Sequence, residues 1–112
     1  EEYLVNSSNA VVNKKCLDDV GLFNTNYVRG EDLDLWARIA SKYHLIKSSE
    51  ITSIYRIDAE NRSDRSHVSV EKTFIYDIDF NSIKSKYEYE YYKLNIINKI
   101  KSYIVNKEWC SF

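Results

Sequence analysis

The chain has 112 residues, of which 44% are hydrophobic and 14% aromatic, so it can form one compact domain with a modest core. Lysine and arginine number 16 against 17 aspartates and glutamates, a balance that gives no electrostatic case for a nucleic-acid partner. No apolar run approaches the length of a membrane span, and the first residues lack the basic and then apolar pattern of a signal peptide.

The two cysteines and the absence of methionine bear on the redox compartment and the origin of the chain. Cys16 and Cys110 lie in spacings that suggest neither a disulfide framework nor a zinc site, so a reducing cytoplasm is expected. An open reading frame begins with methionine, and this chain has none. We therefore expect a processed or excised piece of a larger protein.

The first third of the chain predicts a strand, a helix and a polar loop. A short strand is expected around residues 10–12, followed by a helix over residues 13–20. Asn13 is placed to cap the start of this helix and Gly21 to end it. The apolar residues that share one face at helical spacing are Val12, Cys16, Leu17 and Val20.

A second helix is predicted to begin at the sequence Gly30-Glu31-Asp32. Its apolar residues cover most of its circumference, and Asp34 and Arg38 are spaced to form an ion pair one turn apart. Residues 51–57 then alternate apolar and polar side chains, which predicts strand structure in one or two pieces. A polar loop follows this alternation.

From Val68 onward, apolar residues at helical intervals predict one or two long amphipathic helices that reach about Lys107. The alternating tyrosines of the stretch KYEYEYYK would also suit a strand, but the helical spacing continues on both sides. This regular stripe should pack on the helix at Glu31, on a second copy of the chain, or on a membrane surface. The lysines available for membrane contact are Lys84, Lys86, Lys93, Lys99 and Lys101. The expected fold class is α+β, mostly helical.

The crowded acids at the start of the second helix have two interpretations. Carboxylates there complement the positive end of the helix dipole, which typically contributes roughly 0.3–1 kcal/mol. The surrounding sequence offers a second interpretation. It contains three stretches in this order: KKCLDDVGLFN, GEDLDLWARIA and YRI. This succession resembles the acceptor-side half of family 2 glycosyltransferases of the GT-A α/β fold. The resemblance covers residues 7–56, about half of the chain.

The resemblance implies an inverting transfer of a sugar from a nucleotide-sugar donor to an acceptor hydroxyl. Asp32 would be the catalytic base that removes the acceptor proton, and Glu31 would orient the acceptor or the local backbone. The small polar residues Ser7, Ser8 and Asn9 precede the first strand, where the family lines a sugar pocket. Such residues are also ordinary in turns.

Three other residues are candidates for substrate binding, each with a structural alternative. Trp36 could stack on a sugar, although its helical spacing favours the core. Arg38 could neutralise a departing diphosphate, although pairing with Asp34 explains it equally well. Arg56, which follows a predicted strand beside a polar loop, is a better candidate for the phosphate side.

The family also implies a divalent metal, Mn²⁺ or Mg²⁺, on the donor diphosphate. Its ligands, an Asp-x-Asp motif, belong to a nucleotide-binding half that would precede Glu1, so most of them would lie outside this chain. Asp77 and Asp79 have the same spacing but come after the Glu-Asp pair, and surface carboxylates explain them better. Many relatives carry a histidine after Tyr-Arg, where this chain has Asp58, and His67 could substitute for it.

Two functions remain open from the sequence. The first is the acceptor-side part of a glycosyltransferase over residues 1–67 with a helical extension over 68–112. It would be inactive alone and would serve bacterial surface polysaccharide synthesis in the cytoplasm or at the inner face of the membrane. Its partners would be a nucleotide-sugar donor, a glycan or lipid-linked acceptor, and a further copy of the chain if it forms a homo-oligomer. The alternative is a non-enzymatic helical module for interaction or oligomerisation, whose working surface is the long tail.

Overall fold

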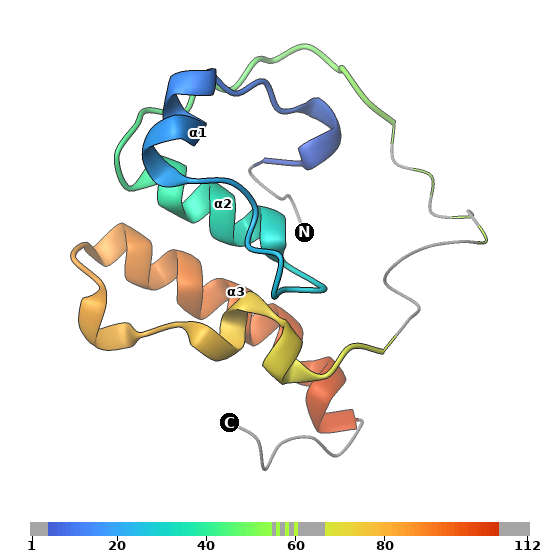
Figure 1. The fold of residues 1–112 in the computed structure, drawn as a ribbon. Coiled ribbons are helices and arrows are strands. Elements are labelled where there is room, and N and C mark those ends of the chain that lie inside the picture. Colours follow the sequence, from blue (N-terminus) through green and yellow to red (C-terminus); the bar gives the residue numbers. More distant parts are fainter. Residues whose placement is uncertain (1–4, 55, 57, 59, 61–66, 106–112) are drawn as a thin grey trace.

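The computed structural model describes residues 5–54, 56, 58, 60 and 67–105, apart from the side chains at 102 and 105 (Figure 1). Three α-helices dominate these residues: α1 (Lys14–Val20), α2 (Glu31–Ala40) and α3 (Lys86–Val105). Short 3₁₀ turns complete the secondary structure: η1 (Ser7–Asn9), η3 (Val70–Lys72), η4 (Phe74–Asp77) and η5 (Phe80–Ser82). The prediction of a mostly helical chain is confirmed.

Helix α1 begins and ends where the sequence predicts. The Asn13 side chain accepts a hydrogen bond from the Lys15 N–H at 3.0 Å, which satisfies one of the free donors of the first turn. Gly21 follows the last turn with a φ of 84°, a value that favours glycine, and its N–H donates to the Leu17 carbonyl.

Helix α2 begins after Gly30, which adopts the left-handed conformation with a φ of 81°. The predicted ion pair is confirmed, because Arg38 and Asp34 approach to 2.8 Å one turn apart. A Cβ atom added to Gly30 would lie 2.7 Å from the Phe74 ring, so α2 and η4 approach too closely for any side chain here.

No strand occurs among the described residues, so the strands expected at 10–12 and 51–57 are not found there, and Tyr55 and Ile57 lie outside the described part. The backbone at 10 and 13 is extended, but it has no neighbouring strand to pair with. Val11, Ile51 and Ile54 are almost fully exposed. The one isolated bridge in the described ranges is parallel and joins Arg29 to Thr73. The alternation of apolar and polar residues therefore did not predict a paired strand, because pairing also requires a neighbouring strand.

The prediction of long helices from Val68 is correct only for its second half. Residues 70–82 form the three turns η3, η4 and η5, and α3 begins at Lys86. Polar side chains bind the local backbone here and compete with helical hydrogen bonds. Thr73 Oγ1 donates to the Val70 carbonyl at 2.6 Å, and Asp79 Oδ1 accepts from the Asn81 N–H at 2.9 Å.

Two hydrophobic clusters meet at α2, which lies between α1 and α3 in Figure 1. One joins α2 to α1 and the segments around it, and its buried members are Leu35, Trp36 and Ile39. The other joins η3, η4 and α3, and its buried members are Val70, Phe74, Ile75 and Tyr103. Leu33 of α2 packs against the second cluster. Residues on both sides of position 67 thus share one core.

Helix α3 packs within the chain through one side and leaves apolar side chains on another. The Tyr91 hydroxyl donates a 2.9 Å hydrogen bond to the Leu33 carbonyl in the first turn of α2. Leu94, Ile97 and Ile104 remain about half exposed. Among the helices described, none is both long enough and apolar enough to cross a membrane.

Candidate functional site

Asp32 lies in the first turn of α2, and a hydroxyl from a distant part of the chain contacts it. Ser7 Oγ in η1 donates a hydrogen bond to Asp32 Oδ2 at 2.8 Å, across 25 positions of sequence. The capping of η1 places Ser7, since the Asn6 side chain accepts from the Ser8 N–H and turns the chain. The first small polar residue of the resemblance thus touches its predicted base.

The other oxygen of Asp32 binds the helix itself. Oδ1 accepts from the Leu33 N–H at 2.8 Å, one of the donors that a first helical turn leaves free. The carboxylate and its neighbour Glu31 are partly buried in the first turn of α2, where acidic side chains complement the positive end of the helix dipole. Asp32 therefore binds the start of α2 through Oδ1 and the distant Ser7 through Oδ2.

A second contact extends the polar surface beside Asp32. Asn9 Nδ2, also in η1, donates to Ser53 Oγ at 3.4 Å, across 44 positions of sequence. Ser8 and Asn9 are exposed, so their side chains are accessible to a ligand. The structure thus brings three separated segments, η1, the start of α2 and the segment around Ser53, into one polar region.

The side chains of Trp36 and Arg38 are both engaged in contacts within the protein. Trp36 is only 8% exposed in the cluster with Leu35 and Ile39, and its Nε1 has no hydrogen-bond partner among the described residues. Arg38 pairs with Asp34 and also donates to the Val20 and Leu22 carbonyls, the latter at 2.8 Å. Its guanidinium fork satisfies free carbonyls at the end of α1 and joins the two helices.

The remaining candidates lie apart from Asp32. Arg56 is largely exposed and forms a 3.4 Å ion pair with Asp58, the residue in the family's histidine position. His67 is exposed and packs edge to face against Tyr103 of α3, with ring centroids 6.2 Å apart. The described residues contain no cluster of three histidine, cysteine or acidic side chains that could hold a metal ion. They do not fit a metal centre, so the metal remains a prediction about residues elsewhere.

Tyr91 is a neighbour of the site that the sequence did not single out. Its ring belongs to the apolar stripe of α3, but its hydroxyl reaches the first turn of α2. Burial, and after it the charge of Asp32, raises the pKa of the Tyr91 phenol well above its usual range. The contact spans 58 positions, and no local pattern could have indicated it.

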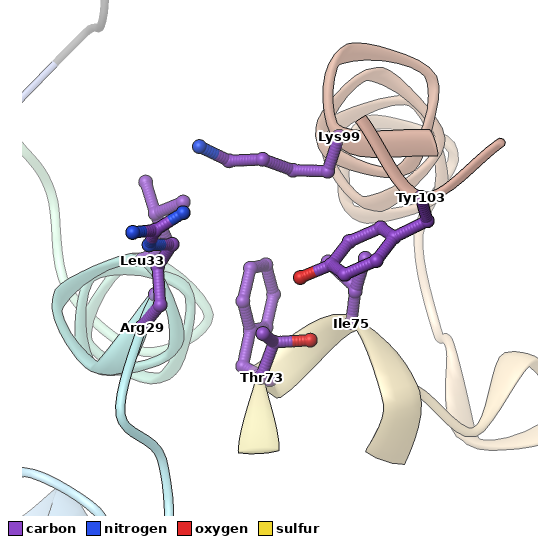
Figure 2. Close-up of a pocket in the computed structure, with 8 residues that line it drawn as sticks. Arg29, Leu33, Thr73, Ile75, Lys99 and Tyr103 are labelled. Carbon is purple, nitrogen blue, oxygen red and sulfur yellow. The ribbon is translucent and has the colours of Figure 1, made fainter. Parts of the chain in front are cut away.

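A small recess opens on the other side of the start of α2. Figure 2 shows Arg29, which precedes α2, and Lys99 of α3 extending toward the same space, with the Tyr103 hydroxyl pointing the same way. Its volume of about 10 Å³ is only that of one water molecule, so it cannot enclose a substrate.

The comparisons with known proteins add no relative: the chain matches no family model, no curated protein and no solved structure.

Proposed function

We propose that this chain supplies the acceptor-side part of an inverting glycosyltransferase, with Asp32 as the catalytic base. The hydrogen bond from Ser7 to Asp32 is the observation that carries the proposal. It joins two motifs of the resembling segment, the small polar residues at its start and the Glu-Asp pair. A carboxylate that only caps a helix needs no distant hydroxyl on its second oxygen.

The proposed chemistry is one displacement at the anomeric carbon. The acceptor hydroxyl forms a bond to that carbon, its proton passes to the Asp32 carboxylate, and the nucleotide diphosphate leaves with the electrons of the broken bond. Ser7 acts on Oδ2 as a positioning residue, because its hydrogen bond fixes the orientation of the carboxylate. Mn²⁺ or Mg²⁺ would stabilise the leaving diphosphate in the complete enzyme.

The GT-A assignment is part of the same proposal. In that fold, the segments at 10–12 and 51–54, which are outside any helix, would pair with a sheet from the nucleotide-binding half. Their almost fully exposed apolar side chains, Val11, Ile51 and Ile54, would then be covered. This exposure supports the assignment, because isolated extended segments seldom leave apolar side chains entirely in water.

Removing the Ser7 hydroxyl tests the proposed positioning. In the complete transferase, Ser7→Ala should lower turnover roughly tenfold, because Asp32 loses a hydrogen bond that orients it. Ser49→Ala is the matched control, since Ser49 is exposed and takes part in none of the contacts described for the site. Turnover equal in the Ser7 variant, the control and the parent would contradict the proposal.

An interaction module is the second candidate, and the exposed side of α3 favours it. Leu94, Ile97 and Ile104 lie three or seven residues apart and therefore share one helical face. If this face is the working surface, light scattering will show a stable oligomer, or binding to anionic liposomes, that Leu94→Glu with Ile97→Glu abolishes. A parent chain that stays monomeric and ignores lipid would dismiss this candidate.

A further inference from the structure

A cavity of about 150 Å³, apart from the polar region at Asp32, lies where α2, η4, η5 and α3 come together. Asp34 projects from α2 on the side opposite to Asp32, since two helical positions are about 200° apart. The side chains that matter here come from five segments: Tyr27, Asp34, Phe74, Asp77, Asp79 and Tyr92. The cavity is open to solvent, and its volume is enough for a small organic cation.

Three aromatic residues, Tyr27, Phe74 and Tyr92, are among those that line this cavity. Phe74 is buried, and Tyr92 lies against it with ring centroids 6.4 Å apart and planes tilted by 46°. Tyr27 is partly buried and lines the cavity as well. The faces of such rings carry partial negative charge and attract cations within about 6 Å.

Two carboxylates at the rim carry negative charge that no cation of the described chain pairs with. Asp77 and Asp79 are exposed, and neither forms a salt bridge within residues 5–54 or 67–105. Asp34 differs, because Arg38 offsets its charge. The cavity therefore combines an aromatic wall with a net negative rim.

The rim carboxylates have neighbours within the chain. The Tyr27 phenol lies close to Asp77, and burial together with this carboxylate raises the pKa of Tyr27 to about 12. Asp79 Oδ1 accepts from the Asn81 N–H at 2.9 Å. A ligand would thus meet preorganised groups, which reduces the entropy lost on binding.

We propose that this cavity binds an alkylammonium group, such as the head of a choline or the amine of an amino sugar. The rings would contact the alkyl part of the cation and the rim carboxylates its charge. A metal ion fits poorly, because the described residues contain no cluster of three ligands for it. The proposal is independent of any role of Asp32 in catalysis.

Amide NMR titration of the folded chain tests this proposal with four probes. Choline and glucosamine carry the cation, whereas dimethylbutanol and glucose are their uncharged counterparts. We expect saturable shifts of the Tyr27, Asp77 and Tyr92 amides with one or both cations. The cation that binds more tightly shows whether the cavity prefers a choline head or an amino sugar. The double variant Asp77→Asn and Asp79→Asn should weaken the response about tenfold.

Asp18→Asn is the control, because Asp18 is an exposed carboxylate on α1, and it should leave the titration unchanged. The proposal is wrong if the uncharged counterparts bind as tightly as the cations. It is also wrong if neither cation shifts the three amides, or if the folded double variant responds like the parent.

Discussion

Gly30→Ala should destabilise the protein more than a normal glycine replacement at the start of a helix. Gly30 has a φ of 81°, and an alanine in the left-handed region costs about 1 kcal/mol or more. The new methyl would also lie 2.7 Å from Phe74 Cδ1, well inside van der Waals contact. Phe74 is only 4% exposed, so its ring cannot simply turn into solvent.

The two effects together predict a loss of about 2–4 kcal/mol in the free energy of unfolding, since overpacking a core typically costs about 1–3 kcal/mol. Urea denaturation followed by circular dichroism measures it. In a Phe74→Leu background the ring is gone, and Gly30→Ala should cost only about 1 kcal/mol. An equal cost in both backgrounds, or a cost below about 0.5 kcal/mol in the parent, would refute the close approach of α2 and η4.

Three further predictions concern the contacts around α2. Arg38→Lys should lower the free energy of unfolding by about 1–2 kcal/mol in urea denaturation, because one ammonium cannot reach Asp34 and the carbonyls of α1 together. Unchanged stability would show that these contacts are not needed for folding, and Arg38 would again be a candidate for substrate binding. Tyr91→Phe should cost about 1 kcal/mol by the same measurement through the lost bond to the Leu33 carbonyl, and no change would exclude that bond. Because the pKa of Tyr27 is raised to about 12 from 10.0, the folded state holds its proton longer than the unfolded state, so stability should decline between pH 10 and 12. The decline should be shallower in Tyr27→Phe, and identical urea midpoints across this range would contradict it.

Local chemistry made the first two helices predictable. Asn13 and Gly21 bound α1, and the pairing of Asp34 with Arg38 follows from their spacing of one turn. These features depend on neighbours within four residues, which a sequence displays directly. The core position of Trp36, favoured by its helical spacing, has the same origin.

The remaining features depend on contacts between distant segments. The apolar spacing after Val68 is helical, but hydrogen bonds from Thr73 and to Asp79 divide residues 70–82 into short turns. The strand predicted at 51–54 is not found there, because alternating apolar and polar residues do not reveal whether a neighbouring strand is available for pairing. At the candidate site, the motif predicts a role for Asp32, whereas the contact of Asp32 with Ser7 crosses 25 positions and becomes visible only in the fold.

Asp32→Asn separates a catalytic base from a residue that only stabilises the first turn of α2, because asparagine keeps the size and the acceptor oxygen of aspartate but does not take up a proton. Turnover in the complete transferase, at saturating donor and acceptor, is measured beside the melting temperature, with Glu31→Gln and Asp18→Asn as comparisons. We expect turnover to fall by about 10² to 10⁴ in the Asp32 variant with little change in melting temperature, and to fall less for Glu31→Gln. If the Asp32 variant keeps more than about half of the parent turnover, Asp32 is not the base, and its carboxylate serves only the start of α2.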